Sequence, residues 1–181
     1  MALPQTPPPV KRLCGMIASQ PEWMDEALGA LVGQWGPADL VSELMPFDFT
    51  HYYDQPMGQP LWRRFVGFER LVGPEALMEA KRATNRIEAD MAARCPQGPP
   101  RPINLDPGYI ELSKLVLASM KNFSHRLYLG GGVYGELTLL VRGGRWEPLP
   151  WTFPDYAGPR YHGFLEQLRQ RLRQQLRELR E

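Results

Sequence analysis

The segment from Arg101 to Tyr128 holds most of the side chains in this chain that could do chemistry. Amide, carboxylate, imidazole and cationic groups stand there between short apolar runs; they are Asn104, Asp106, Tyr109, Lys114, Ser119, Lys121, His125 and Arg126. Lysine and arginine bind anionic groups, whereas a carboxylate or an imidazole can transfer protons. No spacing in the segment dictates one reaction, so it indicates where a site lies rather than which chemistry it performs.

Asp106 is the first candidate for a catalytic group. It opens the sequence Asp106-Pro107-Gly108-Tyr109, in which proline presets φ and glycine accepts positive φ, so a tight type II turn is expected. Asp106 would then serve as a general base or metal ligand at the edge of the turn, and Tyr109 would lie at its exit. The structural alternative, which we favour because aspartate is common in turns, is that the carboxylate caps the N–H groups of the turn.

A polar stripe is expected on the predicted helix over residues 74–93. Lys81, Thr84, Asn85 and Glu88 follow one another at helical spacing beside its apolar face. A solvated face is the common explanation for such a stripe. The short, uncharged residues in its middle are weak helix formers and instead favour a polar site that faces inward.

A predicted hairpin around Gly130–Gly132 brings further groups together. If its strands pair directly, Arg126 lies opposite Glu136 on a polar face of the sheet. This pair is either an exposed ion pair or part of a ligand-facing cluster. His125 and Glu136 complete the catalytic candidates with Asp106, although a lone histidine is more often structural.

Two loops combine aromatic residues with a single aspartate: DFTHYY, which starts at Asp48, and WTFPDY over 151–156. Such loops can line a small-molecule pocket, with Asp48 as a ligand-binding candidate. They can equally close the end of a sheet core. The sequence favours neither alternative.

Several familiar sites are excluded by their missing motifs. The chain has no GxxxxGK[ST] loop, no GxSxG elbow, and no HExxH or CxxC spacing. The glycines at 130–132 precede no helix, so they are a poor phosphate cradle. No metal site is expected, and the sequence indicates no particular cofactor.

Hydrophobic periodicity, proline and glycine predict the elements that position these groups. Strands are expected at 10–18, 39–47, 61–71 and 103–105, with helices at 21–34 and 74–93. Strands at 114–119, 126–129, 133–141 and 146–149 follow as an antiparallel meander, and an amphipathic helix over 160–181 ends the chain. The first six elements have the βαββαβ order of ferredoxin-like folds. We therefore predict one α+β domain over residues 10–181, after a disordered proline-rich arm over 1–9.

Composition limits the classes of partner. The 181 residues carry 21 Lys and Arg against 20 Asp and Glu, a net charge of +1, which argues against a dedicated nucleic-acid-binding protein. No RNP-type strand is present to support RNA binding. No apolar run approaches the roughly 18 residues of a membrane span, and the N-terminus lacks a secretion signal. With only Cys14 and Cys95, a cytoplasmic location is expected.

Longer strings of this sequence resemble a known family. They are FDFTHYYDQPMG, KRATNRIE, NLDPGYIELSKLVLASMKNFSHRLYLGGGVYGELTLL and PLPWTFPDY. Together they are similar to a bacterial family of unknown function, domain of unknown function 4416, over about residues 10–161. Members are often labelled GTP-binding, but neither a P-loop nor an NKxD motif is present here. The resemblance implies no activity, substrate or cofactor.

Two functions follow as expectations. The first is binding or processing of a small anionic ligand, of the nucleotide or phosphorylated-metabolite kind, in a polar cleft. The second is a protein-interaction module, or a homodimer, that acts through the arginine-flanked leucine stripe of the 160–181 helix. Docking of that helix onto its own sheet is the structural alternative. Whether the protein is an enzyme stays open.

Overall fold

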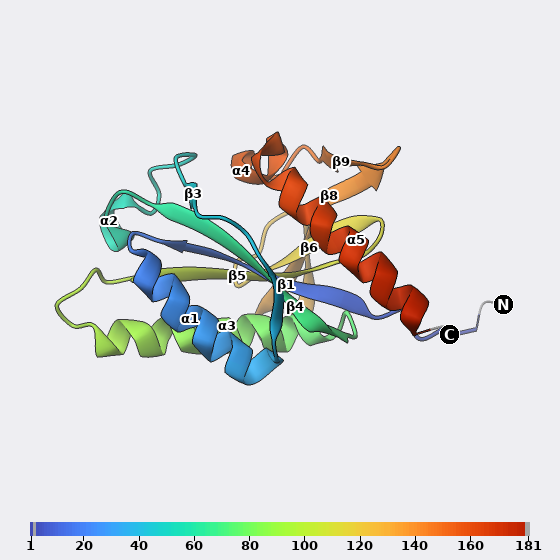
Figure 1. Ribbon diagram of the computed structural model, residues 1–181, viewed down its shortest axis with the longest axis horizontal. Coiled ribbons are helices and arrows are strands. Elements are labelled where there is room, and N and C mark those ends of the chain that lie inside the picture. The colour runs from blue at the N-terminus through green and yellow to red at the C-terminus, as the bar shows by residue number, and fades with distance from the viewer. Residues whose placement is uncertain (2, 180–181) are drawn as a thin grey trace.

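The strand β1 (Val10–Ala18) lies at the centre of the sheet in the computed structural model, which describes residue 1 and residues 3–179. It pairs antiparallel with β4 (Trp62–Val72) along one edge and with β5 (Ile103–Ile110) along the other. Eight of its nine residues are buried, because helices cover both faces of the sheet (Figure 1). A nearly continuous apolar run is what such a strand requires.

Within the described residues the sheet has nine strands in the order β2-β4-β1-β5-β6-β8-β7, where β3 also pairs with β4 and β9 also pairs with β8. The remaining strands are β2 (Ala38–Val41), β3 (Met45–Pro46), β6 (Lys114–Ser119), β7 (Arg126–Gly130), β8 (Val133–Arg142) and β9 (Arg145–Pro148). β8 carries β6 along one edge, and β7 and β9 along the other. The predicted meander is therefore wrong, because β6 and β7 follow each other in sequence but are not neighbours in the sheet. β8 lies between them, and the loop over 120–125 connects them across its position.

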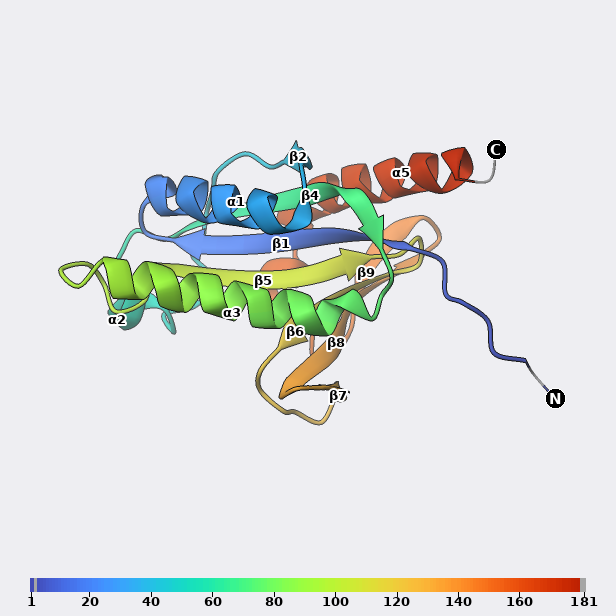
Figure 2. The ribbon, with the colours of Figure 1, turned by 90° about the horizontal axis from the view of Figure 1, so that it is seen from below.

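Three long helices cover the sheet. α1 (Pro21–Trp35) and α3 (Ala76–Arg94) lie on one face, and α5 (His162–Glu178) lies on the other (Figures 1 and 2). Shorter helices are α2 (Asp54–Met57), α4 (Pro154–Ala157) and the 3₁₀ turn η1 (Pro159–Tyr161). No helix within residues 3–179 has both the length and the apolar character needed to cross a membrane.

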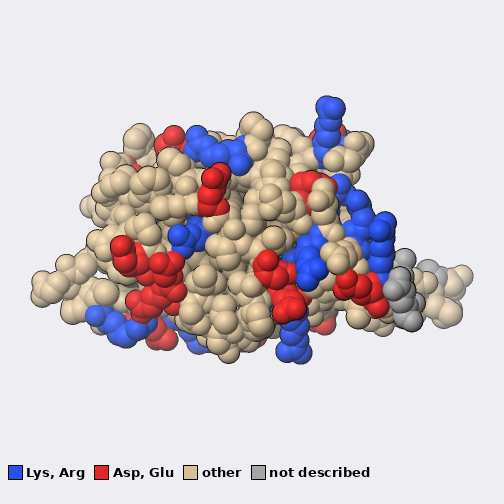
Figure 3. All heavy atoms as spheres, in the orientation of Figure 1, with Lys and Arg blue, Asp and Glu red and all other residues tan. Residues whose placement is uncertain are grey.

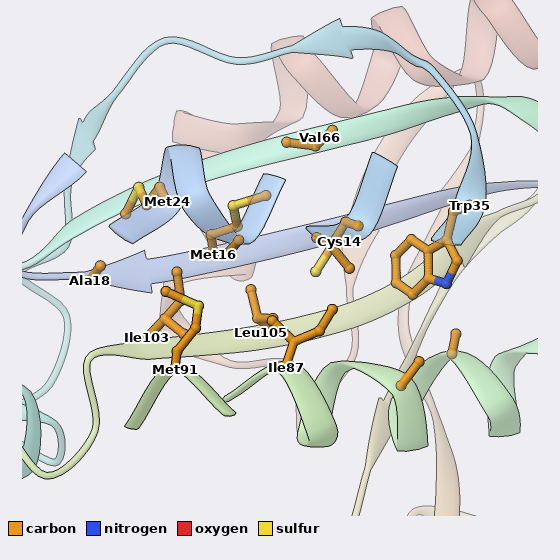
Figure 4. Close-up of a cluster of buried hydrophobic side chains, with 14 of the residues drawn as sticks. Cys14, Met16, Ala18, Met24, Trp35, Val66, Ile87, Met91, Ile103 and Leu105 are labelled. Atoms are coloured by element: carbon orange, nitrogen blue, oxygen red, sulfur yellow. The ribbon is translucent and has the colours of Figure 1, made fainter. Parts of the chain in front are cut away.

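Alternation along β1 separates two cores. Cys14, Met16 and Ala18 point towards α1 and α3 and pack with Leu105 and Ile87 (Figure 4). On the opposite face, Leu13 and Phe65 pack against the leucines of α5, which are Leu165, Leu168 and Leu172. The leucine stripe of α5 is thus buried within its own chain.

Most predicted elements are confirmed, and two are not. The segment 39–47 forms two short strands instead of one. Residues 103–110 form one continuous strand, where a strand over 103–105 followed by a turn was predicted. The turn expected at Asp106–Tyr109 is therefore wrong: Gly108 does not have positive φ, and both of its neighbours pair with β1. The hairpin at Gly143-Gly144 is confirmed, with φ of 54° and 78°.

Other parts of the predicted architecture stay predictions. The mixed α and β content and the antiparallel sheet are present, but the ferredoxin-like assignment, the single domain and the cytoplasmic location are not established by them. Residue 2 of the predicted arm and residues 180–181 of the predicted tail helix lie outside the described residues.

The sheet opens into a wedge between β5 and β6. These strands pair only where Gly108, Tyr109 and Ile110 face Leu117, Val116 and Leu115. At the pair Gly108–Leu117, a Cβ on residue 108 would lie 2.6 Å from the backbone oxygen of Val116. The close approach of β6 to β5 at this point therefore requires glycine. Figure 2 shows β6, β7 and β8 turning away from the plane of β1 and β5. Among residues 3–179, no strand pairs with residues 103–107 of β5 along the edge towards β6.

Candidate functional site

A cleft of about 1070 Å³ occupies this wedge. β5 and α3 form one wall, and β6, β7 and β8 form the opposite wall. The loop that includes Phe47–Tyr53 and the start of α4 close the remaining sides. Its volume is at the upper end of the range usual for small-molecule sites.

Side chains of α3 satisfy the free edge of β5. The carboxylate of Glu88 accepts a hydrogen bond from the backbone N–H of Leu105 at 2.7 Å, and the ammonium of Lys81 donates to the Leu105 carbonyl at 2.8 Å. Pro107, two residues further along the same edge, has no N–H that would need a partner. The polar stripe of α3 thus replaces the missing strand, while leaving the space beside it open.

Arg63 lies beneath the cleft as a buried cation between two carboxylates. Its guanidinium donates to Asp106 at 3.2 Å and to Asp155 at 2.8 Å. Rings of Phe47, Phe65, Tyr156 and Tyr161 surround it, each centred within 6 Å. Burial raises the pKa of the Asp155 carboxyl, although Arg63 opposes that shift. Arg63 thereby ties β4, β5 and α4 together under the cleft.

Asp106 is held by one of its two oxygens. Oδ2 accepts from Arg63 and, at 2.8 Å, from the amide of Asn104. Arg101 donates in turn to Asn104 and to Glu88. Burial raises the pKa of Glu88 above its usual value, against the lowering effect of Lys81 and Arg101. The predicted capping role of Asp106 is wrong, since its partners are the side chains of Arg63 and Asn104 and not the backbone N–H groups of a turn.

The opposite wall is built around Glu136, whose carboxylate is buried. Oε2 accepts from Arg126 at 2.6 Å and lies 3.1 Å from Nε2 of His125, which is stacked on Trp151. Oε1 is also buried and has no hydrogen-bond partner among the described residues. The predicted pairing of Arg126 with Glu136 across the hairpin is confirmed, and the pair is largely buried.

At the mouth, one hydrogen bond joins two loops that are far apart in sequence. The ammonium of Lys121 donates to the hydroxyl of Tyr52 at 3.0 Å and lies 5.0 Å from the centre of its ring. This contact lowers the pKa of Tyr52. Both aromatic loops of the sequence contribute to the lining, and Phe49 and Tyr53 also pack against the core.

The structure brings eight of the twelve candidate residues into the cleft lining: Lys81, Asn85, Glu88, Asn104, Asp106, Lys121, Arg126 and Glu136. His125 touches Glu136 from behind the wall. The other three lie elsewhere. Tyr109 points to the α3 face of β5, Lys114 pairs with Glu111 at the far end of β6, and Asp48 pairs with Arg160 on the exterior.

Three charged residues of the lining, Arg63, Arg101 and Asp155, were not among the sequence candidates. Arg63 had a signal, because it stands two residues before Phe65 and therefore on the same, buried face of β4. Asp155 lies in the aromatic loop over 151–156 but was not singled out. Nothing in the sequence near Arg101 indicates its role.

Within the described residues, no three His, Cys, Asp or Glu side chains gather as a metal site would require. No curated protein and no solved structure matches the sequence. The profile of one family, described as Domain of unknown function (DUF4416), matches residues 8–172. This match covers most of the chain, and the protein therefore belongs to the DUF4416 family.

Proposed function

We propose that the cleft binds a small anionic ligand. The main support is the burial of Lys81, which lines the cleft although only 7% of its surface is exposed. Its ammonium donates to one backbone carbonyl and forms no salt bridge among residues 3–179. A buried ammonium group is costly unless anions compensate it. The nearby Glu88 carboxylate, whose pKa Lys81 lowers, supplies part of that compensation, and an anionic ligand in the cleft would supply the rest.

The charge of the lining agrees with this proposal. Five cationic side chains, Arg63, Lys81, Arg101, Lys121 and Arg126, face four carboxylates, those of Glu88, Asp106, Glu136 and Asp155. Three of the cations are held by carboxylates, whereas Lys81 and Lys121 contact only neutral groups. Each of these two ammonium groups uses one of its three donor hydrogens in these contacts, so each keeps donors for an anion. On the face drawn in Figure 3, acidic and basic residues are also intermixed, as on an ordinary solvated surface.

For processing of the bound ligand, Asp106 is the best-placed proton acceptor. Its Oδ2 is fixed by Arg63 and Asn104, and its side chain remains 27% exposed. Glu136 has its Oε2 bound to Arg126 and His125, and its side chain is only 2% exposed, so it is less accessible to a ligand than Asp106. The proposed function is ligand binding. If the protein also converts its ligand, Asp106 would be the residue that accepts the proton.

A thermal-shift screen tests the proposal, with inorganic phosphate, sugar phosphates and nucleotides as probes. We expect one of these classes to raise the melting temperature, because ligand binding stabilises the folded state. Lys81→Ala should weaken binding of that probe by about 10- to 100-fold, which corresponds to loss of one charge-assisted contact.

Lys114→Ala is the matched control, since Lys114 lies outside the cleft and should not affect binding. Absence of any stabilising probe, or equal losses for the two lysine variants, would refute the proposal.

A further inference from the structure

Three aromatic rings at the mouth of the cleft are exposed to solvent. Tyr52, Phe123 and Phe153 keep 61%, 63% and 43% of their surfaces accessible, and they come from three different segments of the chain. Large apolar side chains gathered at the edge of a cleft favour a ligand that covers them. A small, fully polar anion would neutralise the lysines and leave these rings in water.

Cationic groups stand beside two of these rings. Lys121 lies 5.0 Å from the centre of the Tyr52 ring, and Arg126 lies 6.0 Å from that of Phe153; Arg101 lies 5.6 Å from the ring of the neighbouring Tyr53. A molecule that stacks on one of these rings is thus within reach of a positive charge. The pairing of rings with cations favours a ligand that combines a planar ring system with an anionic group.

The lining also has hydrogen-bonding groups that a planar anion alone would not use. Asn85 and Asn122 each offer an amide, which can donate to and accept from the edge of a heterocycle. The buried Oε1 of Glu136 accepts no hydrogen bond from the described residues and requires a donor. A ribose hydroxyl is a suitable donor, because carboxylates accept hydrogen bonds from ribose hydroxyl groups in dinucleotide-binding folds.

We propose that the ligand of this cleft is a nucleoside phosphate. This inference rests on the proposed function and makes it specific. The phosphate would bind Lys81 or Lys121, the base would stack on the rings at the mouth, and a sugar hydroxyl would donate to Glu136. An aromatic carboxylate would lack the hydroxyl groups, and a sugar phosphate would lack the ring.

Isothermal titration calorimetry on the full chain separates these ligand classes. The probes are adenosine and guanosine 5′-monophosphate, ribose 5-phosphate and inorganic phosphate. We expect at least one nucleotide to bind about tenfold or more tightly than ribose 5-phosphate, because the two differ only by the base. Phe123→Leu and Phe153→Leu should each weaken binding of that nucleotide several-fold, and leave binding of ribose 5-phosphate unchanged.

Tyr128→Leu is the control variant. Tyr128 is 63% exposed, as Phe123 is, but lies outside the cleft lining. Phe123→Tyr, which keeps the ring, should restore nucleotide affinity.

Each alternative result has one meaning. Equal, Lys81-dependent affinity for ribose 5-phosphate and both nucleotides would overturn the nucleoside assignment and leave the proposed anion site intact. Failure of all four probes to bind would overturn the nucleoside assignment itself. The broader thermal-shift screen would then decide whether any anion site exists. Tighter binding of a six-nucleotide RNA than of the mononucleotides would also overturn the assignment, in favour of single-stranded nucleic acid.

Discussion

Arg63→Met is expected to lower the free energy of unfolding by about 3–5 kcal/mol, the usual cost of removing one partner from a buried ion pair. The substitution keeps much of the side-chain volume but leaves the Asp155 carboxylate buried without its cation. Asp106 would lose one of its two supports. Urea denaturation followed by circular dichroism measures the change.

Arg64→Met provides the matched control for Arg63. Its guanidinium pairs with Asp25, whose side chain is 68% exposed, so the loss should stay below about 1 kcal/mol. Adding Asp155→Asn to Arg63→Met should recover part of the stability, because the uncompensated charge is then removed. A variant Arg63→Met as stable as the parent protein would show that Arg63 does not organise the floor of the cleft.

Leu168→Ala should cost about 2–5 kcal/mol, since a buried leucine is replaced in a packed core. Leu168 is fully buried and packs directly over Gly67 of β4. The loss should be independent of protein concentration, because the leucine stripe of α5 docks within the same chain. Chemical denaturation at two protein concentrations a hundredfold apart measures both quantities.

Leu179→Ala, beyond the end of α5 at an exposed position, should change stability by less than about 0.5 kcal/mol. If the loss for Leu168→Ala grew as the protein was diluted, the helix would instead support a dimer, as the alternative expectation from the sequence holds. Light scattering on the parent protein would then show that dimer directly.

Local patterns were enough to predict many of the elements. The apolar run of β1, the proline at the start of α1 and the Gly-Gly turn before β9 each have a local physical cause, and each is found where that cause indicates. The helix predicted to start at Pro74 begins two residues later, at Ala76. The second strand was predicted too long, because Ser42, Glu43 and Leu44 form no ladder pair and separate β2 from β3.

The polar cluster was harder to predict, because long-range pairing decides it. Pro107-Gly108 has the composition of a turn, yet Gly108 is needed for the close approach of β6, which no local pattern encodes. The polar stripe of α3 was predicted from spacing alone. It faces inward, since Lys81 and Glu88 form hydrogen bonds with the backbone of Leu105 at the free edge of β5. Arg63 was missed because a charged residue in an alternating strand suggests an exposed face.

The most direct test of the cleft as a ligand site is a nuclear magnetic resonance titration of the isotopically labelled protein with adenosine 5′-monophosphate. We expect amide signals to shift for residues 104–106 on one wall and 119–122 on the other, while those of β9 and of α5 remain unchanged. Saturable shifts confined to residues far from the wedge between β5 and β6, or no saturable shifts at all, would contradict this expectation.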